Sequence, residues 1–182
     1  MTTSNAPSIK LSTKPLFSSD EIAARIETLS AQIDKDYRGR EILMIAVLKG
    51  SFLFVADLIR AVKTPAVIDF VRLASYGSAT QSSGIIEVRK DLEMSIKDKH
   101  VLVVEDIVDS GLTLESLRSM LLNRQPASLK ICTLIDKQAH RVTDVPVDYI
   151  GFSMDDGFIV GYGLDLDERY RDLPDIRVVE NV

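Results

Sequence analysis

Three carboxylic acids stand beside small hydroxyl residues near the middle of the chain. Glu105 and Asp106 directly follow the apolar run at residues 101–104, and Asp109 comes three residues later. A Ser-Gly-Leu-Thr turn at residues 110–113 follows and leads into a helical pattern. A buried parallel strand that enters a small-residue loop and then a helix is how α/β proteins build a phosphate site, because the loop amides and the helix N-terminus donate hydrogen bonds. The pattern predicts such a site here.

The acids narrow the class of ligand. Glu105 and Asp106 would repel a bare phosphate, so we expect them to hold ribose hydroxyl groups or a Mg²⁺ ion. The chain has neither the Gly-Lys-Ser/Thr of a P-loop nor a G-x-G-x-x-G dinucleotide motif. Two solvated acids at a strand end are the simpler alternative, and Asp109 fits N-capping of the helix as well as it fits catalysis. Position at the carboxyl end of a central strand favours a sugar-phosphate site.

Other charged and aromatic residues allow a functional and a purely structural interpretation. Lys49, in a strand-to-turn junction, could meet an anion or be an exposed loop lysine. Lys137 follows an apolar run and could instead form a surface ion pair with its neighbour Asp136. Phe158 would by default belong to the core, and Asp165 could be part of a solvated acidic loop.

Composition sets limits on the class of protein. The chain has 182 residues, of which 46% are hydrophobic and 27% charged, which is ordinary for one globular domain. Its net charge of -5 disfavours general binding to nucleic acid or to an anionic membrane. No apolar run approaches the length of a membrane span, and we see no signal peptide, so we expect a cytoplasmic protein. The single cysteine, Cys132, is expected to be a buried structural thiol.

Strand and helix patterns alternate along the chain. Ser18 and Glu21 form a capping box, and the apolar spacing after them predicts a helix. Further helices are expected at residues 52–62 and 114–121, and the Gly/Ser-rich residues 75–84 are expected to form a lid-like hairpin loop. The predicted strands are residues 41–47, 67–73, 85–88, 101–104, 129–135, 149–152, 158–162 and 177–179. This order predicts an α/β fold whose largely parallel sheet carries helices on both faces.

Residues 105–113 resemble the phosphoribosyl-diphosphate-binding motif of type I phosphoribosyltransferases. Five further segments are similar to the members of that family that act on 6-oxopurines. They are Leu48-Lys49-Gly50, Ser75-Tyr76, Lys137, and the segments at residues 158–165 and 171–174. The resemblance covers roughly residues 16–180. It implies a type I phosphoribosyltransferase fold, in which a central mainly parallel sheet is flanked by helices and terminal segments form a small hood that includes about residues 155–175. Residues 1–15 would be a loose N-terminal arm, and residues 16–182 a single domain.

The resemblance also implies an activity. Such enzymes serve purine salvage by transferring the 5-phosphoribosyl group of 5-phosphoribosyl 1-diphosphate to N9 of hypoxanthine or guanine, with Mg²⁺ as cofactor and pyrophosphate as product. Asp109 matches the residue that takes the N7 proton, and the peptide bond before Lys49 is often cis in the family. By the same resemblance the donor-binding residues are Lys49, Gly50, Glu105, Asp106, Asp109, Ser110, Gly111, Leu112, Thr113 and Arg171. The purine-binding residues are Lys137, Phe158, Ile159 and Asp165; the lid residues are Ser75 and Tyr76; the metal ligands are Glu105, Asp106 and Asp165.

Three alternatives stay open at this point. A regulator of pyrimidine genes could keep this fold and bind RNA, but it would need a basic face. A related enzyme specific for xanthine and guanine, and a receiver-type domain that binds Mg²⁺ through acids at strand ends, fit the segment at 158–174 less well. The family further implies a homodimer or homotetramer with no nucleic-acid or membrane partner, and it leaves the preference among hypoxanthine, guanine and xanthine open.

Overall fold

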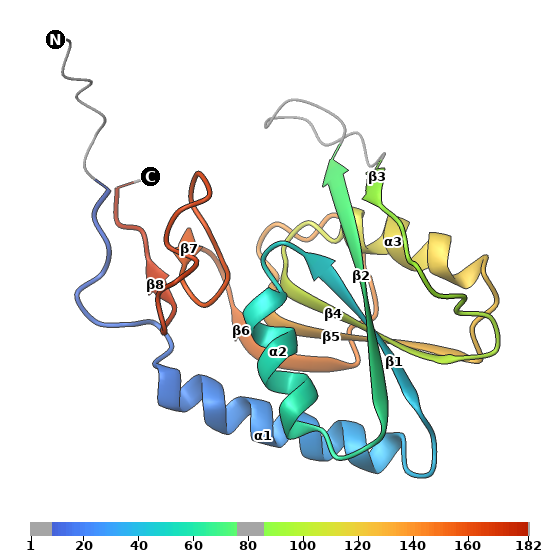
Figure 1. The fold of residues 1–182 in the computed structure, drawn as a ribbon. Helices are drawn as coiled ribbons and strands as arrows, with labels where there is room; N and C mark the ends of the chain where they lie inside the picture. The colour runs from blue at the N-terminus through green and yellow to red at the C-terminus, as the bar shows by residue number, and fades with distance from the viewer. Residues whose placement is uncertain (1–8, 76–85, 182) are drawn as a thin grey trace, which may run out of the picture.

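The computed structural model describes residues 9–75 and 86–181. Its main body is a six-stranded sheet with helices on both faces, and a small two-stranded sheet lies beside it (Figure 1). The elements in chain order are α1 (Ser19–Asp36), β1 (Ile42–Leu48), α2 (Phe52–Ala61), β2 (Ala66–Ser75), β3 (Ile86–Lys90), β4 (His100–Val108), α3 (Leu112–Leu122), β5 (Ser128–Lys137), β6 (Tyr149–Met154), β7 (Ile159–Val160) and β8 (Arg177–Val178).

The large sheet has the strand order β3-β2-β1-β4-β5-β6. Strands β2, β1, β4, β5 and β6 pair in parallel, and only β3 pairs antiparallel, with β2. The largely parallel sheet predicted from the sequence is therefore confirmed. The chain winds outward from β1 on one side and from β4 on the other, and ligands bind in open α/β sheets where the strand order reverses in this way.

Both faces of this sheet are buried, which explains the continuous apolar runs in its strands. Met44 and Ala46 of β1 pack in one core with α1 and α2, while their neighbours Leu43 and Ile45 pack in a second core with α3. Alternate residues point to opposite faces of a strand, so one run supplies both cores. Cys132 is buried in the first core, as expected.

The first helix begins where its capping box predicts. The Ser18 hydroxyl accepts a hydrogen bond from the Glu21 N–H, and the Glu21 carboxylate accepts one from the Ser18 N–H. Two N–H groups that lack partners inside the helix are satisfied in this way.

None of the helices in the described residues is long and apolar enough to cross a membrane. The cytoplasmic location stays a prediction.

The small sheet of β7 and β8, together with the residues around it, forms the hood beside the carboxyl ends of the main strands. The described part of the N-terminal arm lies along it, because Leu11 bridges to Val179 and the Ser12 N–H donates to the Val178 carbonyl at 2.8 Å. The division of the chain into arm and domain stays a prediction.

Two strand predictions need correction. The strand predicted at residues 158–162 is only Ile159–Val160, because Gly161, Tyr162 and Gly163 all have positive φ and turn the chain sharply. The strand predicted at residues 101–104 continues to Val108. Glu105 and Asp106 therefore lie inside β4 instead of after it. Most of the predicted lid, including Tyr76, lies outside the described residues, and Ser75 is the last residue of β2.

Candidate active site

Two adjoining hollows lie where β1 and β4 end. The larger, of about 270 Å³, is lined by the turn after β1, by β4 and by the hood, and its predicted site residues are Lys49, Gly50, Glu105, Asp106, Asp165 and Arg171. The smaller, of about 150 Å³, is lined by the loop between β4 and α3 and shares Glu105 with the first. All of the predicted donor-binding residues except Leu112 thus line one of the two hollows. A hollow of about 830 Å³ between α1 and α2, at the opposite end of β1, contains none of them.

The paired acids differ in their surroundings. Glu105 is only 9% exposed, while Asp106 is half-buried. Burial, and next the charge of Asp106, raise the pKa of the Glu105 carboxyl above its usual range. The Asp106 carboxylate lies against the backbone of Gly50, and a Cβ atom at Gly50 would overlap with Asp106 Oδ2. Glycine is therefore the residue that lets the β1 turn approach β4. The peptide bond between Leu48 and Lys49 is cis, as the resemblance implied.

The loop between β4 and α3 has the form of an anion site. Gly111 precedes the first residue of α3, has φ of 81°, and provides no side-chain cap. Asp109 does not cap the helix, so that alternative is wrong. The N–H groups of Val142 and Thr143 donate to the Ser110 carbonyl at 2.9 and 3.1 Å and hold the loop in place. Ser110, Gly111 and Thr113 of this segment line the smaller hollow at the N-terminus of α3.

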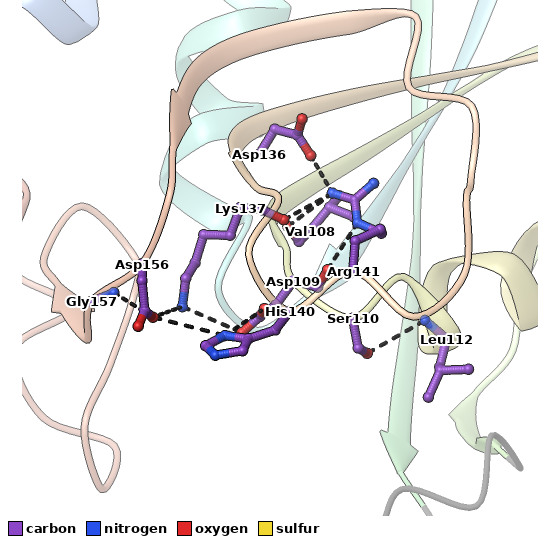
Figure 2. A network of polar contacts seen from close by, with 10 residues as sticks. All are labelled: Val108, Asp109, Ser110, Leu112, Asp136, Lys137, His140, Arg141, Asp156 and Gly157. Carbon is purple, nitrogen blue, oxygen red and sulfur yellow. Dashed lines mark hydrogen bonds and ion pairs between the residues drawn. The ribbon is translucent and has the colours of Figure 1, made fainter.

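Lys137 and Asp109 meet at the other side of this loop (Figure 2). Lys137 is the last residue of β5 and is 7% exposed, and its Nζ lies 3.3 Å from Asp109 Oδ2. The alternative of a surface ion pair with Asp136 is wrong, because Lys137 is buried and points to Asp109. Asp156 also approaches Lys137 Nζ, at 3.8 Å. A buried cation at the end of β5 therefore contacts a carboxylate from the loop after β4.

Arg141 is a site residue that no sequence pattern predicted. Figure 2 shows its guanidinium between Asp136 and Asp109, where it donates to the carbonyl groups of Val108 (3.4 Å), Asp109 (2.9 Å) and Lys137 (3.1 Å). It also pairs with the buried carboxylate of Asp136. One side chain thus fixes the ends of β4 and β5 relative to each other. No motif marks it, because all but one of its partners are backbone oxygens.

His140 and Glu168 were likewise not predicted as site residues. No motif includes His140, yet its Nδ1 lies 3.7 Å from Asp109 Oδ1 and 3.8 Å from Asp156 Oδ1. Glu168 forms ion pairs with Lys49 and Arg171. The acidic run at residues 165–168 was the only sequence signal for Glu168. Asp165 pairs with Arg171 at 2.9 Å, so the interpretation of this run as a merely solvated loop is wrong.

The hood carries an exposed aromatic ring, that of Phe158, which is close in sequence to Asp165. Phe158 is 41% exposed, so the default assignment to the core is wrong, whereas the next residue, Ile159, is buried. A large aromatic side chain left open to solvent can stack on a flat heterocycle. This exposure agrees with the purine-stacking role that the resemblance implies for Phe158, while the role itself stays a prediction.

Unsatisfied polar atoms gather in the same region. Among the described residues, the buried side-chain atoms without a hydrogen-bond partner are Asp109 Oδ1 and Arg171 Nε. Buried polar groups are nearly always paired in folded proteins, and exceptions concentrate where a ligand completes the pairing. Asp109, which carries the first atom, contacts Lys137, and Arg171, which carries the second, lines the larger hollow together with Lys49.

The acids fit a divalent cation that is shared with a substrate. Within the described part of the chain, no three metal-ligating side chains converge closely enough to hold an ion by themselves. Mg²⁺ is commonly bound by one or two carboxylates, with waters and substrate phosphates completing its coordination. Glu105 and Asp106 on one wall of the larger hollow and Asp165 on the other match that arrangement.

Comparison with known proteins agrees with this geometry. The family model for the phosphoribosyl transferase domain matches residues 12–167. The chain therefore belongs to the phosphoribosyltransferase family.

Its relatives narrow the class further. It is 49% identical to the hypoxanthine-guanine phosphoribosyltransferase of Mycobacterium tuberculosis over 164 residues, which is 87% of this chain and 81% of the relative. It is also 49% identical to the hypoxanthine phosphoribosyltransferase of Salmonella typhimurium, over 85% of this chain and 88% of the relative. The crystal structure of a hypoxanthine-guanine phosphoribosyltransferase from Bacillus anthracis superposes with a TM-score of 0.89 at 46% identity, covering 94% of this chain and 99% of that one.

Proposed function

We propose that this protein transfers the 5-phosphoribosyl group of 5-phosphoribosyl 1-diphosphate to N9 of hypoxanthine or guanine and releases pyrophosphate, as a step of purine salvage. The observation that carries the proposal is the contact of 3.3 Å between the buried Lys137 ammonium and the Asp109 carboxylate beside the phosphate-type loop. The named relatives support the same activity.

The two side chains suit two neighbouring positions on one edge of a 6-oxopurine, the 6-oxo group and N7. The Lys137 ammonium donates to the 6-oxo group, which adenine lacks, and a site built around such a donor rejects a base that leaves it unpaired. The Asp109 carboxylate accepts the N7 proton as N9 bonds to the sugar. Its Oδ1 is buried without a hydrogen-bond partner in this structure, and an N–H of the base would satisfy it. The exposed ring of Phe158 would stack on the purine, with Ile159 beside it.

The donor fits the two hollows on the side of Glu105 and Asp106. Its 5-phosphate would lie on the amides and hydroxyls of residues 109–113, and its diphosphate near Lys49 and Arg171. Mg²⁺ held by Glu105, Asp106 and Asp165 would neutralise charge on the departing pyrophosphate. Lys49 and Arg171 stabilise the same charge. Ser75 and Tyr76 are proposed to close over the site and exclude water.

The test is release of pyrophosphate from 5-phosphoribosyl 1-diphosphate with Mg²⁺ and each of hypoxanthine, guanine, xanthine, adenine and uracil. We expect turnover with hypoxanthine and guanine, and little with adenine or uracil. Turnover with uracil alone would overturn the purine assignment. Omitting the metal, or replacing it with Ca²⁺, tests the proposed role of Mg²⁺.

We also propose that the enzyme is a homodimer or homotetramer in the cytoplasm. A structural neighbour from Trypanosoma cruzi, a hypoxanthine phosphoribosyltransferase with a TM-score of 0.88 and 40% identity, was studied for the effect of its C-terminal region on oligomeric state. Sedimentation equilibrium of the purified chain tests the assembly. No comparison favours the RNA-binding alternative.

A further inference from the structure

Glu168 joins the two cations that line the larger hollow. Its Oε1 lies 2.8 Å from Lys49 Nζ, and its Oε2 lies 3.0 Å from an Arg171 guanidinium nitrogen. The two cations come from the turn after β1 and from the hood, 122 residues apart by their numbers (171 less 49). One carboxylate therefore bridges two distant elements, with a different oxygen on each.

The turn that carries Glu168 is built to aim it. Leu166 and Arg169 pair through reciprocal backbone hydrogen bonds of 3.2 and 3.1 Å, and the Glu168 N–H donates to Asp165 Oδ2 at 2.9 Å. Glu168 itself has φ of 64°, a conformation that few side chains adopt without a reason from their surroundings. Its pKa is lowered, first by the hydrogen bond from Lys49 and then by that from Arg171, so the carboxylate is charged at neutral pH.

We propose that Glu168 stands in for the diphosphate of the donor: in the donor-free protein its carboxylate occupies the two cations that the diphosphate takes over on binding. This inference rests on the proposed function. A carboxylate that bridges a lysine and an arginine through separate oxygens presents the same charge-assisted contacts as two oxygens of a diphosphate.

The contact is suited to displacement. The Glu168 side chain is 62% exposed, and exposed ion pairs are weak because water screens them. Arg171 does not depend on Glu168 for its position, since it donates to the Gly163 carbonyl at 2.7 Å and pairs with Asp165 at 2.9 Å. A more highly charged diphosphate can therefore displace the carboxylate while the cations stay in place.

The chain offers a matched control for this idea. Asp167 is in the same turn and also has positive φ, but within the described residues it forms no ion pair with Lys49 or Arg171. Glu168→Gln and Asp167→Asn each remove one negative charge from the turn, and only the first removes the competitor. Both side chains are exposed, so we expect both variants to fold, and thermal melting checks this.

The experiment measures pyrophosphate binding by calorimetry and the KM of each substrate. For Glu168→Gln we expect pyrophosphate affinity to rise roughly two- to tenfold, from the loss of two exposed ion pairs. The KM for the donor should fall by a similar factor while the KM for hypoxanthine stays the same, and Asp167→Asn should resemble the wild type. Unchanged or weaker pyrophosphate binding by Glu168→Gln, or an equal gain in Asp167→Asn, would overturn the inference. A wild type that binds pyrophosphate but turns over no purine would instead count against the proposed function.

Discussion

Replacing Arg141 by methionine removes the guanidinium that connects β4 and β5 beneath the site. Methionine keeps the unbranched stem but none of the donors. The carbonyl groups of Val108, Asp109 and Lys137 each lose a partner, and the carboxylate of Asp136 loses its counter-charge. Because Asp109 and Lys137 are proposed to bind the base, the variant tests stability and activity at once.

The expected loss of stability follows from the burial of Asp136. This residue is 2% exposed, and a buried charge stripped of its partner costs about 3–5 kcal/mol. We therefore expect the free energy of unfolding, measured in urea at pH 7, to fall by that amount. Small domains have only about 5–15 kcal/mol in total, so the change in midpoint is easily measured.

A double variant separates the two effects. Arg141→Met combined with Asp136→Asn leaves no buried charge without a partner. The new amide oxygen can still accept from Gln138, which donates to the Asp136 carboxylate at 3.1 Å in this structure. We expect most of the stability to return while kcat/KM stays about 10²-fold reduced, since the ends of β4 and β5 are no longer fixed and small displacements of reacting groups have effects of that size. If activity returns together with stability, Arg141 is only a structural partner of Asp136 and the reasoning is refuted.

Further substitutions test other parts of the structure. Asp109→Asn should lower kcat about 10²- to 10⁴-fold at near-normal donor KM, and unchanged turnover would exclude it as the proton acceptor. Gly50→Ala should raise the donor KM, because its Cβ would displace the Asp106 carboxylate; a normal KM would mean that this carboxylate or the turn shifts without effect on the donor. Burial opposes ionisation of Asp69, but three backbone N–H donors lower the pKa of its carboxyl on balance. A lowered pKa adds stability above the unfolded pKa of about 4 that disappears as the pH falls toward the folded value. Asp69→Asn should therefore lose about 1–3 kcal/mol at pH 7 in urea unfolding and progressively less in acid, and a constant difference would contradict this.

Local sequence patterns predicted most of the fold, because the interactions behind them involve residues that are close together in the chain. The capping box at Ser18 and the apolar runs of β1 and β4 each depend on neighbours in sequence or on burial alone. Strand ends were less accurate. β4 continues through Glu105 and Asp106, since pairing with β5 extends as far as Val108, and no local rule reveals how far a partner strand reaches.

The candidate site could be predicted only where a motif concentrates its residues in one segment. The loop at residues 109–113 is such a segment. Arg141 and Glu168 were missed because their contacts cross long stretches of sequence: Arg141 reaches back 32 residues to the Asp109 carbonyl, and Glu168 reaches 119 residues to Lys49. Lys137 and Phe158 were matched by resemblance, while the residues alone favoured a surface ion pair and a core position. Only the exposure of each side chain in the folded structure corrects these two interpretations.

The hood joins the first and last parts of the polypeptide, with Leu11 beside Val179. Proteins are synthesised from the N-terminus, so the first-made segment must wait for β8 to leave the ribosome before it has a partner. Arg171, on the diphosphate side of the site, also emerges late. A growing chain can thus form its central sheet early yet lack a finished donor site. The larger hollow is therefore complete only after the segment that carries Arg171 has been synthesised.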